Sequence, residues 1–202
     1  MTDVVDTAAD LGVEGNSRIT GVLGAILLLV LAVEGVTIWD VRSMLSLHVF
    51  IGFFVIPIVC VKLATTSYRA FHYYRGTAAF RRKGPPHPVL RILAPVVIVS
   101  TVSMLLFGVV TLAVGPNHRE PWLTLHQGSF IVWLVATAVH VLGHLFETWK
   151  LTRDEVLGKP PVPRRGTRLL VVGVGVAVGL ALGIASLKWT GAWTNARFGH
   201  DG

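Results

Sequence analysis

Five long apolar segments, separated by short polar ones, account for most of this chain. They are residues 19–38, 45–66, 89–114, 123–146 and 169–187. Each has about 18 or more residues with almost no charge, the length that an α-helix needs to cross the hydrocarbon core of a bilayer. The pattern therefore predicts an all-α integral membrane protein with five transmembrane helices. Residues 1–18 and 188–202 are left as polar tails, and residues 148–168 as a basic, proline-rich linker.

The composition supports this class and leaves no second soluble domain. Of the 202 residues, 52% are hydrophobic and 14% are charged, a balance typical of integral membrane proteins. Residues 1–18 carry acidic residues rather than the basic start of a signal peptide, so we expect the first span to be retained. The single cysteine, Cys60, lies inside an apolar segment, which excludes an intramolecular disulfide.

The basic residues gather in two of the loops. Residues 62–91 contain seven Lys or Arg and no acid, and residues 147–168 contain six against three acids. The positive-inside rule places both loops in the cytoplasm, which predicts an N-in, C-out topology in the inner (cytoplasmic) membrane. The formal net charge of +7 is explained by this topology and by contact with anionic membrane lipids. We therefore expect no nucleic-acid partner.

Three histidines interrupt the fourth apolar segment, and a histidine within a span is a functional-site hypothesis. His126 and His140 are 14 residues apart, which on a helix is a rise of about 21 Å with a rotation of about 40°. His144 follows one turn later, about 27 Å from His126 and almost in line with it. One face of this helix therefore offers ligands near both sides of a membrane.

The second apolar segment carries His48 near its start, with Gly52 one turn later. His48 and His126 each begin a span from the outer side, so we expect them at similar depth. Neutral imidazole is a usual axial ligand of haem iron, and a small residue one turn away leaves room for a porphyrin edge. Lys62 is expected near the level of His140, where it either neutralises a haem propionate or extends to the lipid headgroups.

The histidines also have interpretations that need no haem. His48 and His126 would satisfy each other by hydrogen bonding between helices near the membrane interface. The spacing of His140 and His144 matches a two-histidine metal site. A zinc set would need further ligands, and the sequence offers only Glu147 at the membrane boundary.

Two further patterns belong to helix packing and to the membrane interface. Gly175, Gly179 and Gly183 recur at four-residue steps in the fifth apolar segment, which predicts a close helix-packing face rather than a nucleotide site. Glu34 lies near the outer end of the first segment. It either extends to the interface or accepts protons or a quinol hydroxyl near an outer cofactor.

The arrangement of His48, His126 and His140 resembles the membrane cytochrome b families of bacteria: prokaryotic cytochrome b561 and the b-type subunits of hydrogenases and formate dehydrogenases. In those families the fourth span supplies two ligands with the spacing of His126 and His140, and the second span supplies an outer ligand that matches His48. The resemblance covers residues 19–147. It implies a four-helix haem-binding bundle there, with the fifth span as one C-terminal helix, and two b haems that pass electrons between quinone and a partner.

The chain departs from these families at one position. Their first span gives a histidine near its cytoplasmic start, whereas residues 16–18 read Asn-Ser-Arg. An inner haem therefore lacks its expected second ligand. His72 or His87 would replace it, or His144 is the inner ligand while His140 only lines the site. Otherwise the protein holds one haem.

The expected function is membrane electron transfer by haem b. Electrons would move across the bilayer between a quinol or a cytoplasmic reductase and a redox partner protein. The chain would be an electron-transfer subunit of a larger oxidoreductase complex. The sequence shows no nucleophile–base pair and no phosphate loop, so hydrolysis and group transfer are not expected. Two other classes remain: a haem-free membrane anchor for a partner enzyme, and a transporter that uses the histidines for protons or metal. Bound haem would distinguish the first class from the other two.

Overall fold

The protein is described by a computed structural model that covers residues 2–84 and 87–198. Within these residues every regular element is a helix. Residues 85–86, between the second and third apolar segments, lie outside the described residues. The elements are α1 Thr2–Trp39, α2 Leu45–Tyr74, α3 Ala78–Lys83, α4 Pro88–Val114, the 3₁₀-helix η1 Pro116–His118, α5 Trp122–Leu157, α6 Arg165–Ser186, the 3₁₀-helix η2 Leu187–Trp189 and α7 Thr190–Phe198.

Five helical segments are long and apolar enough to cross a membrane, which confirms the five predicted spans. They are Ala9–Trp39, Leu45–Tyr74, Pro88–Val114, Trp122–Leu157 and Arg165–Thr194. The sequence therefore indicates a multi-pass membrane protein, and the outward-facing apolar side chains of these helices are the surface that lipid would contact.

The helices are longer than the apolar segments that predicted them. The helix α1 begins at Thr2, within the expected polar tail, and α5 continues to Leu157, within the expected linker. A helix ends where its backbone hydrogen bonds end, and not where its side chains become polar. The end of α5 shows this: Gly158 adopts a left-handed conformation, and its N–H and that of Lys159 donate to carbonyls of the last turn, a common helix termination.

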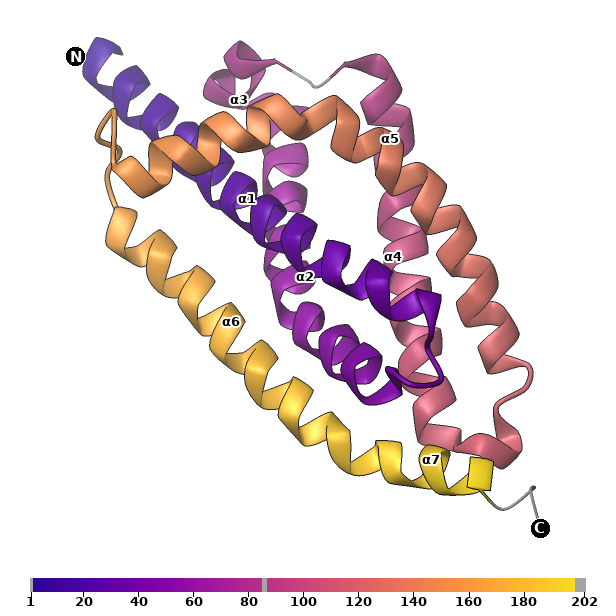
Figure 1. Ribbon diagram of the computed structural model, residues 1–202. Coiled ribbons are helices and arrows are strands. Elements are labelled where there is room, and N and C mark those ends of the chain that lie inside the picture. Colours follow the sequence, from indigo (N-terminus) through magenta and orange to yellow (C-terminus); the bar gives the residue numbers. More distant parts are fainter. Residues whose placement is uncertain (1, 85–86, 199–202) are drawn as a thin grey trace.

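The helices contact one another in the order α6, α2, α1, α5, α4. Figure 1 shows α1 crossing between α2 and α5, with α4 beside α5 and α6 along the outer side of α2. The ends of the bundle differ in charge. One end, which we call the basic end, holds α3 and the segment between α5 and α6; the opposite end holds the 39–45 turn, η1 and α7.

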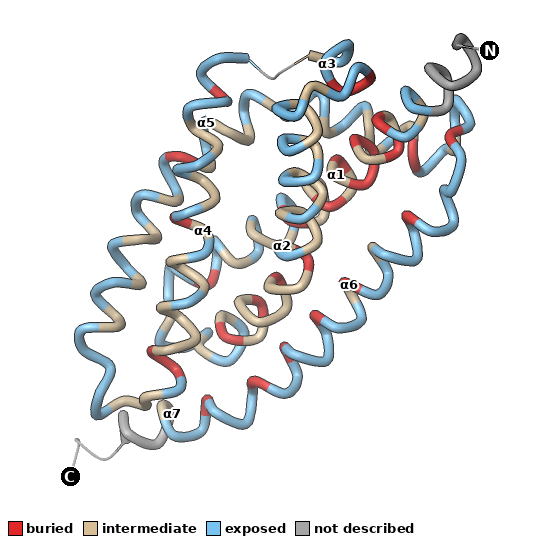
Figure 2. Tube along the Cα trace, turned by 180° about the vertical axis from the view of Figure 1, so that it is seen from behind, coloured by how far each residue is buried: buried red, intermediate tan, exposed pale blue. Residues whose placement is uncertain are grey.

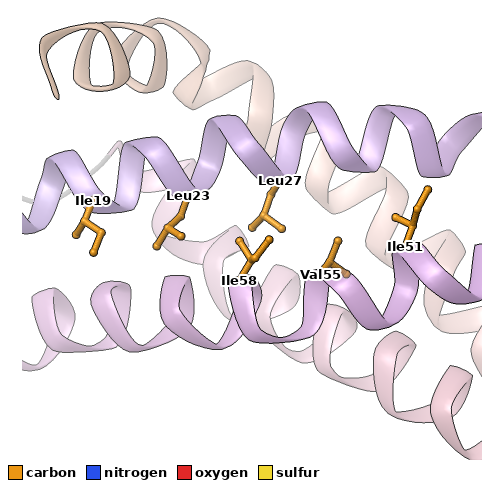
Figure 3. Close-up of a cluster of buried hydrophobic side chains, with 6 residues drawn as sticks. All are labelled: Ile19, Leu23, Leu27, Ile51, Val55 and Ile58. Atoms are coloured by element: carbon orange, nitrogen blue, oxygen red, sulfur yellow. The ribbon is translucent and has the colours of Figure 1, made fainter. Parts of the chain in front are cut away.

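The core lies between α1 and α2. Ile19, Leu23 and Leu27 recur at four-residue steps on α1 and meet Ile51, Val55 and Ile58 of α2 (Figure 3). Residues four apart lie on the same helix face. In a bilayer such contacts gain little from leaving water, because lipid is also apolar. Close van der Waals packing is therefore the main contribution of this cluster.

The fifth span is held against α2 by its glycines. A Cβ at Gly183 would lie 2.8 Å from the ring of Phe50, and a Cβ at Gly179 would collide with the backbone carbonyl of Phe54. Gly175, Gly179 and Gly183 are all buried, and Figure 2 shows the buried positions of α6 recurring along one of its sides. This confirms the predicted small-residue packing face.

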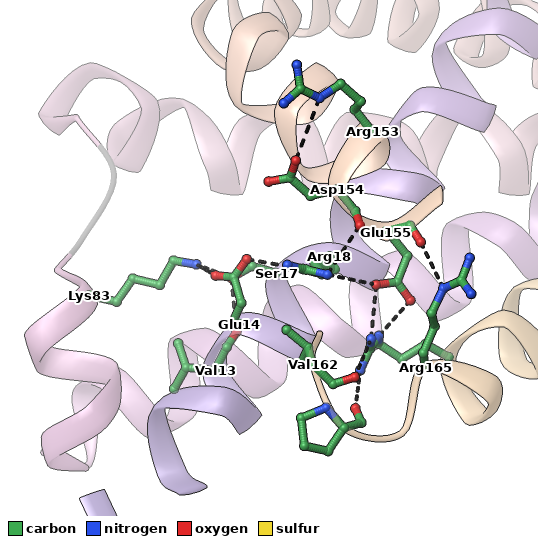
Figure 4. Close-up of polar contacts among 12 residues, drawn as sticks. Val13, Glu14, Ser17, Arg18, Lys83, Arg153, Asp154, Glu155, Val162 and Arg165 are labelled. Atoms are coloured by element: carbon green, nitrogen blue, oxygen red, sulfur yellow. Dashed lines mark hydrogen bonds and ion pairs between the residues drawn. The ribbon is translucent and has the colours of Figure 1, made fainter. Parts of the chain in front are cut away.

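At the basic end, an ion network that was not predicted from the sequence holds three helices together (Figure 4). Glu155 of α5 is 1% exposed, and both of its oxygens accept hydrogen bonds of 2.9 Å from Arg168 of α6. Arg18 of α1, also 1% exposed, lies 3.7 Å from the same carboxylate and donates to the Asp154 carbonyl at 3.3 Å. One carboxylate thus joins the consecutive helices α5 and α6 to α1, which is far from both in the sequence.

A second polar contact at the basic end attaches α3 to α1. The ammonium of Lys83 donates to Glu14 at 3.2 Å and to the hydroxyl of Ser17 at 2.6 Å. Ser17 and its neighbour Arg18 are buried. Residues 16–18, where the cytochrome b families have a haem-ligating histidine, are therefore part of the packing between helices in this protein.

Candidate functional site

The structure brings His48 of α2 and His126 of α5 together near the end opposite the basic end. Their ring centres are 6.2 Å apart, and the ring planes are inclined at 79°. Both helices start at this end of the bundle, α2 at Leu45 and α5 at Trp122, so residues early in each helix reach the same depth. The two imidazoles expected at similar depth are therefore neighbours.

The ring of His126 is oriented by α4. Its Nδ1 lies 2.8 Å from the carbonyl oxygen of Met104. A carbonyl only accepts hydrogen bonds, so Nδ1 carries the proton and Nε2 keeps its lone pair. Gly108 makes this approach sterically feasible, because a Cβ there would lie 3.0 Å from Cε1 of the ring.

The ring of His48 is oriented by α1. Its Nδ1 lies 2.8 Å from a carboxylate oxygen of Glu34 and 3.1 Å from the hydroxyl of Thr37. Thr37 is fully buried, and its hydroxyl donates to the backbone carbonyl of Glu34 at 2.7 Å. Glu34 is thus paired with a histidine rather than extended to the interface. Nδ1 of His48 is engaged, as in His126, and Nε2 remains.

The pair fits two axial ligands of one haem iron. With metal–nitrogen bonds of about 2.0 Å and ring centres about 1.2 Å behind each nitrogen, two imidazoles on one iron have ring centres about 6.4 Å apart, against 6.2 Å for His48 and His126. No described residue forms a hydrogen bond with Nε2 of either ring. A Cβ at Gly52 would meet no atom within 4 Å.

A metal ion without a porphyrin fits less well. Within residues 2–84 and 87–198, no group of three or more His, Cys, Asp or Glu is placed to hold an ion. A zinc site needs at least three such protein ligands, whereas a haem iron needs only two axial ones because the porphyrin supplies four nitrogens. His48 and His126 together supply two nitrogen donors, the number of axial positions on a haem iron.

His140 and His144 lie further along α5, where their rings contact each other. Their ring centres are 4.8 Å apart. Nδ1 of His144 lies 3.3 Å from Glu147, while Nδ1 of His140 is buried without a hydrogen-bond partner in the described structure. Two histidines one turn apart on a single helix point to the same side, so they do not bind opposite faces of one porphyrin.

The helices α4 and α1 pack closely against this half of α5. On the α4 side, a Cβ at Gly143 would lie 2.7 Å from the side chain of Leu90. On the α1 side, a Cβ at Gly21 would lie 2.7 Å from Leu151. These glycines let α4 and α1 approach α5 closely.

Lys62 is directed into the helix bundle. Its ammonium donates to the carbonyl of Thr20 on α1 at 3.0 Å, and it lies 3.0 Å from the position of a Cβ on Gly24. It therefore does not extend to the headgroups, the commoner outcome for a lysine near a membrane boundary.

The remaining histidines lie away from both pairs. His72 is in an aromatic cluster, 4.1 Å from the ring of Tyr68 and 5.2 Å from that of Phe80 on α3. His87 caps the start of α4 by accepting from the backbone N–H of Val89 at 3.4 Å, and His118 is exposed in η1. No described contact joins His72 or His87 to His140 or His144.

Three features of the site around His48 and His126 were not predicted from the sequence. They are the hydroxyl of Thr37, the carbonyl of Met104 and the absence of a side chain at Gly108. A signal existed only for the first, because Glu34 and Thr37 are polar residues one turn apart in an apolar helix. The other two depend on how α4 packs against α5, which no local pattern reveals.

Comparisons with protein-family models, with curated proteins and with solved structures each found no match for this chain. The resemblance to the membrane cytochrome b families therefore depends on the histidine pattern alone. The chemistry assigned to the site follows from its own geometry, and it is a proposal.

Proposed function

We propose that this protein is a haem b membrane electron-transfer protein with one haem, bound between His48 and His126. The observation that carries the proposal is the ring pair itself. Its centres are 6.2 Å apart, and each Nδ1 is held by a different helix, so that the two Nε2 atoms are the nitrogens left for iron. The orphaned His140 and its neighbour His144 do not offer an equivalent pair.

When bound, the haem supplies a reversible one-electron carrier. The residues of the chain orient it and set its surroundings. His126 is fixed by the Met104 carbonyl and His48 by Glu34, so both imidazoles are preorganised with the same ring nitrogen free.

A single haem near one end implies partners at that end. His126 is about 21 Å along the helix from the level of His140. In this proposal the basic end therefore has no redox centre. The electron donor would be a quinol in the bilayer or a reductase, and the acceptor a redox protein at the same face. Transfer to the other face would use a second centre of a larger complex in the inner membrane.

The test is a reduced-minus-oxidised spectrum of the protein, produced in haem-supplied cells and purified in detergent, with the haem-to-chain ratio taken from its pyridine haemochrome. The proposal predicts b-type bands and one haem per chain. A ratio of two would contradict the single site. Protein that is folded but without haem would overturn the proposal.

A haem-free proton-transporting function is the second candidate, because an acid and a histidine 2.8 Å apart inside a membrane span are a plausible proton relay. It predicts that haem-free protein in vesicles dissipates a pH gradient, and that Glu34→Gln abolishes this flux. A haem-free anchor predicts neither haem nor flux.

A further inference from the structure

The two imidazoles of the outer pair have chemically different partners. Nδ1 of His126 faces a neutral backbone carbonyl, that of Met104 at 2.8 Å. Nδ1 of His48 faces the carboxylate of Glu34 at the same distance, 2.8 Å. A carbonyl fixes the tautomer and direction of a ring, whereas a carboxylate also brings a negative charge to it.

We propose that Glu34 is a positioning residue that lowers the reduction potential of the haem by accepting the Nδ1–H of His48. This inference depends on the proposed haem function. It deepens that function by assigning to α1 the control of the site, although α1 supplies no ligand to the iron. The residue acts through His48 and does not contact the iron.

The physical reason is the charge difference between the two oxidation states. Oxidised haem iron carries one more positive charge than reduced iron, so a nearby carboxylate stabilises the oxidised state more. Hydrogen bonding of Nδ1–H to a carboxylate also makes Nε2 a stronger electron donor, which acts in the same direction. Both effects lower the reduction potential.

The surroundings of Glu34 hold its carboxylate beside His48 and limit the screening of its charge. Its side chain is 14% exposed, so solvent and salt screen its charge less than that of a surface acid. Thr37, fully buried, donates to the backbone carbonyl of Glu34 and lies 3.3 Å from its second carboxylate oxygen. The backbone and side chain of this helical turn are thus both held in place beside His48.

The experiment is a redox titration of the haem-loaded, full-length protein and of three variants. Glu34→Gln keeps the size and an acceptor oxygen but removes the charge, so its midpoint potential should shift upward. Glu34→Asp keeps the charge and should remain closer to the wild type. Glu120→Gln removes an exposed charge near the start of α5 and should produce no shift.

Each outcome decides between the claims. If Glu34→Gln binds a full complement of haem at the wild-type potential, the inference is overturned while the haem function stands. If wild-type protein contains no haem, the function fails and the inference with it. If Glu34→Gln folds without haem, Glu34→Asp decides: retention of haem supports the role of the carboxylate, and loss in both variants overturns it.

Discussion

Removal of the charge on Glu155 should be among the most destabilising conservative changes in this protein. Glu155 is 1% exposed and faces two buried arginines, Arg168 through two hydrogen bonds of 2.9 Å and Arg18 at 3.7 Å. Glu155→Gln preserves the volume but leaves Arg168 without its counter-charge and Arg18 with only Glu14, 3.3 Å away. Removing one partner of a buried ion pair typically costs about 3–5 kcal/mol, and we expect a loss of this size in the free energy of unfolding.

The assay is equilibrium unfolding in mixed detergent micelles, followed by helical circular dichroism. Glu120→Gln is the matched control: Glu120 is exposed and accepts one hydrogen bond, from Thr124, so its loss should change the free energy by less than about 0.5 kcal/mol. A double-mutant cycle of Glu155→Ala and Arg168→Ala should give a coupling of about 1–3 kcal/mol. A loss below about 1 kcal/mol in Glu155→Gln, with no coupling, would refute the network.

Two further predictions concern glycines that permit close approach. Gly179→Val should push α6 away from the α2 backbone and destabilise the protein by about 1–3 kcal/mol in the same unfolding assay. The control Gly173→Val, on the same helix, has no atom within 4 Å of its Cβ and should not destabilise the protein in this way. Equal losses of stability in the two variants would contradict the packing of α6 against α2. Gly108→Leu should displace the ring of His126 and reduce the haem content measured by pyridine haemochrome. The control Gly128→Ala has open space around its Cβ and should keep its haem, so full haem in Gly108→Leu would contradict the site.

Local patterns were sufficient for the spans and for part of the site. Apolar runs of membrane-crossing length predicted all five long helices, because a bilayer imposes both length and polarity on a spanning helix. The glycines at four-residue steps in α6 predicted its packing face, because small residues let two helices approach closely. His48 and His126 were expected at one depth from their places near the starts of two spans, and the structure has them as neighbours.

The local sequence patterns did not predict contacts between segments from different helices. Arg18, Glu155 and Arg168 occur in stretches that look like ordinary solvated polar segments, and only the fold shows that they are buried together. The direction of Lys62 likewise depends on the carbonyl of Thr20, which lies on another helix. Spacing along one helix gives the height and the face of a residue, but the opposing helix decides what that residue contacts.

The most direct test of the central claim is the haem content of four single variants, measured by pyridine haemochrome on folded, detergent-purified protein. If one haem is bound between His48 and His126, then His48→Ala and His126→Ala each lose it, while His140→Ala and His144→Ala keep the wild-type ratio. Full haem in His48→Ala or His126→Ala, or loss of haem in the His140→Ala and His144→Ala variants alone, would contradict this assignment of the ligands.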